Sequence, residues 1–366
     1  MFFSNSANNH AKKTILTAPL DWGLGHATRC IPIIKQLNKA GHKVIIAADG
    51  KIRLLLQQEF PENLFIDLQG YNVRYSKNGF WLPIKLIFQI PKIVISIIKE
   101  NYWLKNAIKS HNIDIVISDN RFGLFNKGIF SVYITHQLNI KTGNSFFEII
   151  GTKIHSWFIK QFNECWVPDF KNEKIAGILS HPQNRSANVK YIGCLSRFEP
   201  FEVKKKYDLM ILISGPEPQR TIFEKLLLEQ LGQYKGKILF VRGLPGDKNE
   251  VDIAKEGNII FKNHLNTKEL NQCILESGIV ICRSGYTTVM DLVKLNKKAV
   301  LVPTPGQAEQ IYLAQYLNTK KIFPFVFQHQ INLDKALNLA EDSSFKIPLL
   351  EMNLYKKIIE DFTVNL

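Results

Sequence analysis

Two polar side chains, His26 and Asp119, have the residue types and the settings of a proton-transfer pair. His26 ends the glycine-rich stretch at 23–26, which follows the apolar run 14–18, and Asp119 comes directly after the apolar run 113–118. If both runs are strands of one parallel sheet, their carboxyl ends lie at one edge and the two side chains can approach each other. An aspartate that accepts the Nδ1 proton of a histidine fixes the tautomer and favours the imidazolium form. We therefore predict that His26 is a general base and that Asp119 orients it.

The stretch GLGHATR at residues 23–29 differs from two well-known phosphate-binding loops. A dinucleotide-binding loop has a third glycine near the place of Arg29, and a Walker loop contains Gly-Lys-Ser/Thr. The two glycines let the backbone approach a ligand closely, and His136, which follows the apolar run 131–135, could line the same cleft. Each of these residues also has a purely structural explanation. His26 could cap a tight turn, Asp119 could cap the turn after its strand, and His136 could be a polar strand end. The sequence leaves both explanations open.

Three loops in the second half of the chain carry residues suited to a diphosphate and to sugar hydroxyl groups. Each follows an apolar run and leads into a predicted helix, whose first N–H groups attract phosphate oxygens. Arginine donates paired hydrogen bonds to phosphate, while glutamine and glutamate hold hydroxyl groups in fixed directions. A Pro-rich turn and a first-turn acid are the structural alternatives. The loops are SGPEPQR at 214–220, RSGYTT at 283–288, where Ser284 is the predicted N-cap, and PTPGQAEQ at 303–310.

The alternation of apolar runs with helical segments predicts an α/β protein with two doubly wound parallel sheets. The chain starts as strand, glycine loop, helix and strand over 14–48, which is the βαβ unit of such a sheet, and a second series follows. Residues 195–206 are polar and charged, which is typical of a linker. We therefore expect domains at 1–200 and 201–366, with a terminal helix within 350–366 that can pack back on the first domain.

The chain has 366 residues and a formal net charge of +15, so an anionic partner is expected. Nucleic acid, anionic lipid and phosphorylated small molecules all fit, and an AT-rich genome would explain part of the lysine excess. Residues 1–13 lack the apolar segment of a secretory signal. Lysines and prolines interrupt the longest apolar stretch, 79–98. We therefore expect a cytoplasmic protein without a membrane-spanning helix.

A basic and aromatic stretch at 71–109 is a candidate membrane-contacting segment. It holds seven Lys or Arg residues and one acid, Glu100, with aromatic side chains between them. Such a segment can lie on an anionic bilayer surface, which would place the protein on the inner face of the membrane. A pair of core helices with solvated lysines is the alternative. The residues are Arg74, Lys77, Lys85, Lys92, Lys99, Lys105, Lys109, Trp81, Phe88, Tyr102 and Trp103.

Taken together, the loops resemble those of GT-B glycosyltransferases, and within them the MurG-like and UDP-glycosyltransferase branch (glycosyltransferase family 28/1 type). The likeness rests on GLGHATR, SGPEPQR and the pattern PxPxQxEQ in this order, and it covers roughly residues 14–317. It implies two facing doubly wound Rossmann-like domains with a cleft between them. Compared with the MurG-type loop, this chain lacks a further glycine before His26.

The resemblance also implies that the first domain binds the acceptor and that the second domain binds the donor. The loop at 283–288 would hold the diphosphate, residues 309–310 the ribose or sugar, and residues 264–265 the base, usually uracil. The acceptor-side residues are then Gly23, Gly25, Arg29 and His136, and the catalytic pair is His26 and Asp119. The donor-binding residues are Gly215, Arg220, His264, Leu265, Arg283, Ser284, Gly285, Thr287, Thr288, Gln307, Glu309 and Gln310.

These features together predict an inverting, metal-independent glycosyltransferase. His26 would remove a proton from an acceptor hydroxyl group, whose oxygen attacks the anomeric carbon opposite the leaving diphosphate. No Asp-x-Asp metal motif follows a predicted strand. We expect neither a metal nor a cofactor, because the nucleotide-sugar donor is itself a substrate. The expected acceptor is a lipid-linked or cell-envelope glycan.

Two other functions remain as alternatives. A nucleotide-sugar 2-epimerase of the same fold would release UDP without any acceptor. A basic protein that binds nucleic acid or a membrane surface would also explain the charge. The sequence has no RRM, zinc-finger or helix-turn-helix signature, so nucleic acid is the less favoured partner.

Overall fold

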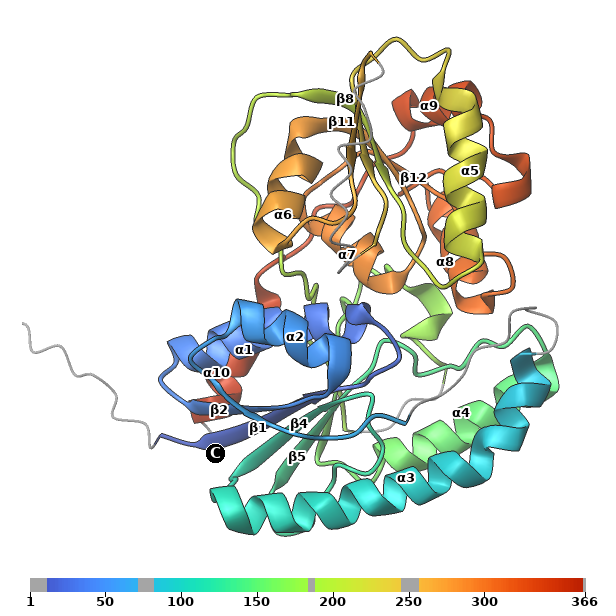
Figure 1. Cartoon of the computed structure of the whole chain (residues 1–366). Coiled ribbons are helices and arrows are strands. Elements are labelled where there is room, and N and C mark those ends of the chain that lie inside the picture. Colours follow the sequence, from blue (N-terminus) through green and yellow to red (C-terminus); the bar gives the residue numbers. More distant parts are fainter. Residues whose placement is uncertain (1–11, 72–81, 184–187, 245–256, 365–366) are drawn as a thin grey trace, which may run out of the picture.

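Two parallel sheets organise the chain, one in each half (Figure 1). The computed structural model describes residues 12–71, 82–183, 188–244 and 257–364, without the side chains of 82–90. The first sheet has the strand order β3-β2-β1-β4-β5-β6-β7 and the second has the order β10-β9-β8-β11-β12. Both are covered by helices on their two faces, as continuous apolar strands require. The predicted α/β architecture with two doubly wound domains is therefore confirmed.

The first domain consists of seven strands with their connecting helices. Its strands are β1 (Thr14–Pro19), β2 (Lys43–Ala47), β3 (Leu64–Ile66), β4 (Ile115–Asp119), β5 (Phe130–Ile134), β6 (Glu164–Val167) and β7 (Val189–Tyr191). Its helices are α1 (Leu24–Lys39), α2 (Gly50–Glu59), α3 (Leu82–His111) and α4 (Ser145–Ile159), with a short 3-10 turn, η2 (Gly177–Leu179).

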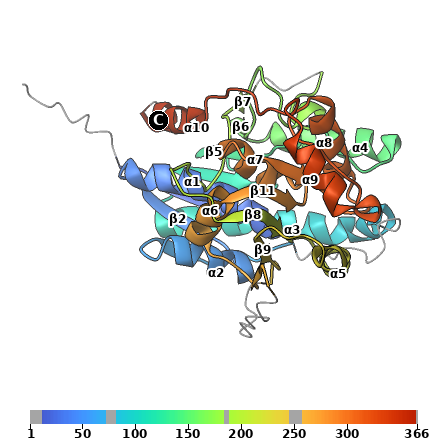
Figure 2. The same cartoon turned by 90° about the horizontal axis from the view of Figure 1, so that it is seen from above.

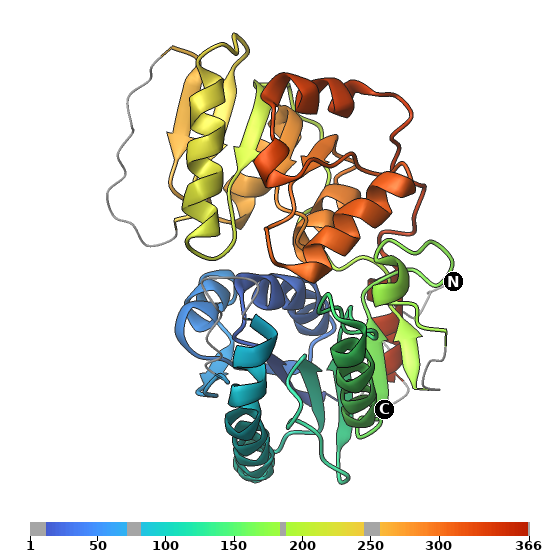
Figure 3. The ribbon, with the colours of Figure 1, turned by 90° about the vertical axis from the view of Figure 1, so that its right-hand side faces the viewer.

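The second domain repeats the pattern with five strands. Its strands are β8 (Tyr207–Leu212), β9 (Ile238–Val241), β10 (Ile259–Lys262), β11 (Ser277–Cys282) and β12 (Ala299–Leu301). Its helices are α5 (Gln219–Leu231), α6 (Thr267–Glu276), α7 (Tyr286–Lys294), α8 (Ala308–Thr319) and α9 (Leu333–Glu341), with a 3-10 turn, η3 (Gln328–Gln330). Figure 3 shows this domain, in yellow to red, above the first domain, in blue to green.

The alternation of side chains along β1 explains how its sheet is covered. Ile15 packs with Ala27 of α1 on one face, and Leu16 packs with Leu104 of α3 on the other. Both strand residues are fully buried. Successive side chains of a strand point to opposite faces, so an uninterrupted apolar run requires a helix on each side. β1 accordingly lies inside the sheet, between β2 and β4.

The last helix, α10 (Leu354–Val364), lies with the first domain although it follows the second in sequence (Figures 1 and 2). Ile359 and Phe362 belong to the same buried cluster as Ile34 of α1. Gln36 Nε2 donates a hydrogen bond of 2.7 Å to Glu360 Oε1. The first domain is therefore assembled from both ends of the chain.

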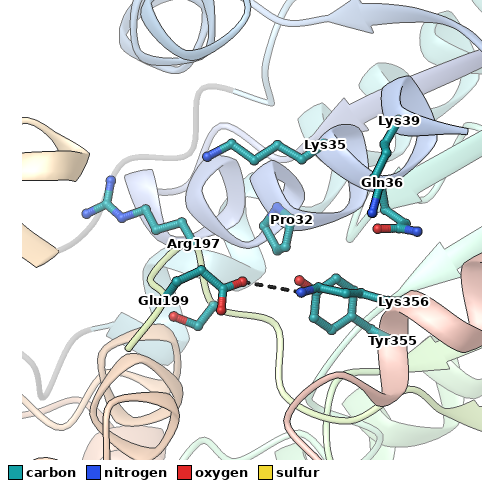
Figure 4. Close-up of a pocket in the computed structure, with 9 residues that line it drawn as sticks. Pro32, Lys35, Gln36, Lys39, Arg197, Glu199, Tyr355 and Lys356 are labelled. Atoms are coloured by element: carbon teal, nitrogen blue, oxygen red, sulfur yellow. Dashed lines mark hydrogen bonds and ion pairs between the residues drawn. The ribbon is translucent and has the colours of Figure 1, made fainter. Parts of the chain in front are cut away.

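A cavity of about 220 Å³ lies where α1, α10 and the connection between the domains meet (Figure 4). Lys35, Lys39, Arg197 and Lys356 give it positive charge. Glu199, on its wall, is 3.5 Å from Lys356 Nζ, and Figure 4 shows this pair. The cavity is at the carboxyl end of α1, roughly 15 Å along the helix from its first turn. It is therefore separate from the site described below.

Within the described residues, no helix is both long and apolar enough to cross a membrane. The predicted membrane-contacting segment is only partly visible. Arg74, Lys77 and Trp81 lie outside the described residues, as do the side chains of Lys85 and Phe88. From Pro91 onward the segment is the remainder of α3, which buries one face, including Leu104 and Ala107, and exposes the other, including Lys92, Lys99 and Tyr102.

Candidate active site

The first and fourth strands bring His26 and Asp119 to the same edge of the first sheet. β1 and β4 pair in parallel, with Ala18 opposite Ser118 and Pro19 opposite Asp119. After Pro19 the chain turns into α1, whose first turn carries His26. This is the point where the strand order reverses, which is where open α/β sheets bind ligands. The predicted approach of the two side chains is present in the structure.

Asp119 is fully buried, and its main partner is Arg29. Arg29 Nε donates to both carboxylate oxygens at 2.9 and 2.8 Å, and Nη2 donates to Oδ1. His26 Nδ1 is farther away, 3.4 Å from either oxygen. Burial raises the pKa of Asp119, but the opposing charge of Arg29, helped by His26, outweighs burial and holds the pKa at about 2. The carboxylate is therefore ionised across the physiological range.

Asp119 favours the imidazolium form of His26, as predicted, but two other effects outweigh it. Burial and the charge of Arg29 lower the pKa of His26, and the charge and hydrogen bond of Asp119 only partly oppose them. The net effect favours the neutral imidazole, and the role of His26 as a base stays a prediction. A neutral histidine can still accept a proton, but only through a nitrogen that carries a lone pair.

A chain of hydrogen bonds leads from this pair across to the second domain. Arg29 Nη1 lies 2.8 Å from His136 Nδ1, and His136 Nε2 lies 2.8 Å from Glu309 Oε1. The ring of His136 also stacks on Tyr286, with centroids 4.1 Å apart. Burial raises the pKa of Glu309, but the interaction with His136 and the charge of Arg29 outweigh burial and lower it. Residues predicted for the acceptor side and the donor side are therefore in direct contact.

The start of α7 faces the turn that carries His26. Thr287 Oγ1 donates a hydrogen bond of 3.3 Å to the carbonyl oxygen of Gly25. A Cβ atom on Gly25 would lie only 3.0 Å from that Thr287 oxygen, so a glycine fits this contact best. Gly285, not the predicted Ser284, is the N-cap of α7, and no described side chain caps it. Ser284 instead donates its hydroxyl proton to the carbonyl oxygen of Gln310.

The two arginines predicted to meet the diphosphate are used elsewhere. Arg283 is 1% exposed, lies over the ring of Phe223 and donates to Gln328 and to backbone carbonyls. Arg220 donates to Glu217 and Glu224, at 2.5 and 2.7 Å. These contacts hold parts of the second domain together, whereas Arg283 Nε has no hydrogen-bond partner among the described residues. A role of either arginine at a diphosphate stays a prediction.

The loop before α8 is braced by its own glutamines. Gln310 Oε1 accepts a hydrogen bond of 3.0 Å from the backbone N–H of Thr304, and Gln310 Nε2 donates to Gln307 Oε1. Gly215, with φ of 107°, is in the left-handed region that favours glycine, and a Cβ there would be 3.7 Å from Thr304 Oγ1. The loops at 214–220 and 303–310 therefore adjoin. Of the predicted residues here, Glu309 is the one that extends to the first domain.

The predicted base-binding residues follow β10, at the carboxyl edge of the second sheet. His264 is exposed, and burial of part of its ring together with the charge of Arg197 lowers its pKa. Leu265 is 8% exposed and packs in the core of the second domain. Thr288, in the first turn of α7, is partly exposed. No hydrogen bond among the described residues joins His264 to the His26 turn.

Three features of the site were missed by the sequence analysis. Arg29 binds Asp119, Tyr286 stacks on His136, and Thr287 contacts Gly25. A signal for the first was present, because Arg29 is three residues after His26 and therefore on the same side of a helix. The other two depend on how the domains face each other, which no local pattern encodes.

Comparison with known proteins gives a family and a fold. A model of the family described as Glycosyl transferase family 1 matches residues 15–338. A Rickettsia felis protein, "UDP-N-acetylglucosamine--N-acetylmuramyl-(pentapeptide) pyrophosphoryl-undecaprenol N-acetylglucosamine transferase", is 22% identical over 358 residues, covering 93% of this chain and 91% of its own length. The crystal structure of Acinetobacter baumannii MurG has a TM-score of 0.59 and 16% identity, covering 97% of this chain and 100% of its own. Spinosyn rhamnosyltransferase SpnG has a TM-score of 0.64 and 11% identity, covering 96% of each chain. The predicted GT-B fold is confirmed.

Proposed function

Because the chain belongs to glycosyl transferase family 1, we propose that it transfers a sugar from a UDP-linked donor to an acceptor hydroxyl group where its two domains face each other. The observation that carries this proposal is the contact between Thr287 Oγ1 and the carbonyl of Gly25. It sets the start of α7 opposite the turn that holds His26. Sugar transfer requires a leaving diphosphate, which we place at the start of α7, and an attacking oxygen, which we place at the His26 turn.

The start of α7 is suited to the diphosphate. Its N-cap is a glycine, so the first N–H groups of the helix are not covered by a capping side chain from the described residues. These groups and the helix dipole attract an anion. Thr287 and Thr288 add hydroxyl donors from the first turn. As the bond to the sugar breaks, this arrangement stabilises the charge that develops on the diphosphate.

Glu309 is suited to a ribose or sugar hydroxyl group. Its side chain is 31% exposed and bonds to His136 in the absence of a ligand. A hydroxyl group of the donor can replace His136 as the hydrogen-bond donor to this carboxylate. The name of the Rickettsia felis relative contains a UDP-linked sugar, which favours UDP as the carrier here. Residues 264–265 then remain the proposed contact for the base.

His26 is the proposed base. Its side chain is 16% exposed, so one edge of the ring can reach an acceptor. Removal of the acceptor proton lets the oxygen attack the anomeric carbon from the side opposite the diphosphate, which inverts the configuration. Assistance of this kind contributes about 10²–10⁴-fold to a rate.

The acceptor that we propose is lipid-linked, because the first domain exposes an apolar surface beside its basic residues. α3 and α4 both flank the first sheet (Figure 1), and Ile97 of α3 and the partly buried Phe158 of α4 contact the same buried cluster. Soluble monomers rarely expose large contiguous apolar patches. The exposed apolar residues of the two helices are Val94, Ile95, Ile98, Tyr102, Phe146, Ile149, Ile150, Ile154 and Trp157.

The charge around this α3–α4 surface also favours an anionic bilayer. Lys92, Lys99, Lys153 and Lys160 are exposed on the same two helices. Glu100, the one acid of the basic stretch, is buried and bonds to Tyr71 and Arg121. The surface therefore presents cations without a competing carboxylate from this stretch, as a peripheral protein on anionic lipid requires.

Vesicle sedimentation tests the α3–α4 surface. Wild type should sediment with phosphatidylglycerol vesicles and much less with phosphatidylcholine vesicles. Ile154→Glu and Trp157→Glu should each weaken binding roughly tenfold, since each removes apolar area and adds a like charge to the lipid. Leu349→Glu, at an exposed position of the second half of the chain, is the matched control and should change nothing. Wild type that stays in solution with both vesicles would refute the surface.

A donor and acceptor assay tests the function itself. A UDP-sugar at about 100 times its Kd should stabilise the protein by about 2.7 kcal/mol, and the bound donor should then label a lipid-linked glycan. Release of UDP with no acceptor present would instead support the 2-epimerase. Absence of stabilisation by every UDP-sugar and by UDP would refute a UDP-linked donor.

A further inference from the structure

We propose that Arg29 is a positioning residue that holds His26 in the tautomer unable to act as a base, and that the donor diphosphate releases it. The second part rests on the proposed function, because it requires a diphosphate at the start of α7. The first part is a statement about the protein without any ligand. It follows from which groups surround the guanidinium of Arg29.

The guanidinium of Arg29 lies at the centre of the site. It is 2% exposed and reaches three side chains at once. Nε and Nη2 donate to Asp119, Nη1 is 2.8 Å from His136 Nδ1, and Nη2 is 2.9 Å from His26 Nδ1. Asp119, His136 and His26 each accept a hydrogen bond from this guanidinium. Removal of any one of them would leave a buried N–H group with fewer acceptors.

Hydrogen-bond donors and acceptors must alternate, and this fixes the tautomers. A guanidinium carries only N–H groups and cannot accept a hydrogen bond. Both histidines must therefore present a lone pair at Nδ1, which leaves the proton of each neutral ring on Nε2. His136 provides an independent check, because its Nε2 lies 2.8 Å from a carboxylate oxygen of Glu309, where a donor is needed.

His26 in this tautomer has no free lone pair with which to take the proton of the acceptor. Nε2 already carries a proton, and the lone pair at Nδ1 is occupied by Arg29. The base form needs a proton on Nδ1 that is donated to Asp119, whose oxygens are 3.4 Å away. The change conserves charge: Nε2 gives one proton to solvent, and Nδ1 takes one up. A small retreat of Nη2 would open the space for that hydrogen bond.

The start of α7 supplies a reason for Arg29 to retreat when a donor binds. His136 lies between Arg29 and Tyr286, the first residue of α7, in contact with both. A diphosphate at this helix start brings negative charge close to the guanidinium and competes for its Nη groups. Nε can keep its hydrogen bonds to Asp119, so the carboxylate stays paired. The base would thus form only when a leaving group is in place, which limits reaction without donor.

Nuclear magnetic resonance of histidine side chains tests both parts directly. Two-bond proton–nitrogen spectra of ¹⁵N-histidine-labelled protein distinguish the two neutral tautomers, and the His26 signal is identified by its loss in His26→Gln. Free wild type should show His26 protonated at Nε2. Saturating UDP, with binding followed by calorimetry, should move the proton to Nδ1. Arg29→Lys should show Nδ1–H without any ligand, because one ammonium group cannot reach Asp119 and both rings. Arg53→Lys, at a surface pair with Asp67, is the matched control.

The outcomes separate this inference from the function on which it partly rests. A free wild-type protein with His26 protonated at Nδ1 would overturn the positioning role, even if Arg29→Lys fails to fold. Bound UDP that leaves the proton on Nε2 would overturn the release. If calorimetry detects no binding of UDP, the proposed donor fails and the release fails with it. The tautomer of the free protein would still decide the positioning role.

Discussion

Replacement of Asp119 by asparagine should destabilise the first domain by about 3–5 kcal/mol at pH 7, because it leaves the guanidinium of Arg29 buried without a counter-ion. Arg29 is 2% exposed and Asp119 is fully buried, so solvent does not screen the pair. Removal of a carboxylate charge at the surface should have a smaller effect. Asp67→Asn removes the partner of Arg53 at a carboxylate that is 83% exposed, and it should cost about 1 kcal/mol or less.

The same pair predicts how this stability depends on pH. The folded state lowers the pKa of Asp119 from 3.8 to about 2, and each pKa unit corresponds to about 1.4 kcal/mol. The carboxylate therefore contributes about 2 kcal/mol, fully present above pH 5 and lost as the pH falls through 3.8 toward 2. About half of it should be gone at pH 3. Asp119→Asn lacks this contribution, so its deficit relative to wild type should narrow in acid.

Tryptophan fluorescence during urea unfolding is a suitable assay, because all five tryptophans are in the first half of the chain. The signal therefore reports on the first domain, even though a two-domain protein need not unfold in one step. Unfolding at pH 7 and at pH 3 should be followed for wild type, Asp119→Asn and Asp67→Asn. The reasoning would be refuted if Asp119→Asn came within 1 kcal/mol of wild type at pH 7 with the same dependence on pH.

Three further predictions concern turnover. His26→Ala should lower kcat about 10²–10⁴-fold with UDP affinity little changed. The low pKa of His26 in the free enzyme should let kcat/KM reach its plateau below pH 6.5, since kcat/KM reports the groups of the free enzyme and the neutral imidazole is already formed there; a titration of kcat/KM above pH 6.5 would contradict this. Gly25→Ala should lower kcat/KM for the donor roughly tenfold, about 1.4 kcal/mol, because its Cβ would meet Thr287 Oγ1 at 3.0 Å. Gly232→Ala is the control, because a Cβ there meets no atom within 4 Å, and equal kinetics for the two variants would refute the contact.

Much of the fold could be predicted because apolar runs reveal buried parallel strands. The terminal helix predicted within 350–366 is α10 at Leu354–Val364, and the run 113–118 is β4 within two residues. Strand pairing then followed from topology, which is why His26 and Asp119 were expected at one edge. Local patterns succeed here because burial on both faces leaves a strand few residue types.

The direction in which a side chain points was much harder to predict. Arg283 follows a strand, as a phosphate ligand would, but Phe223 and Gln328 draw it into the core of the second domain. Both partners are distant in sequence, so no local pattern could reveal them. The apolar face of α4 was missed for a related reason. A helix that is apolar on most sides is usually buried, and only the assembled structure shows that Phe146 and Trp157 are uncovered.

The contacts between the domains engage groups that the proposed function assigns to ligands. Gly25 bonds to Thr287 where a diphosphate is proposed, and His136 bonds to Glu309 where a hydroxyl group is proposed. A donor must therefore replace both contacts, and the domains must separate locally to admit it. The loss of the Thr287–Gly25 contact is compensated by a stronger one, since the diphosphate carries more charge than a carbonyl oxygen. Donor binding is consequently coupled to the arrangement of the two domains. A substitution that weakens the His136–Glu309 bond should ease entry of the nucleotide. The same substitution should also weaken the contact that holds the two domains together.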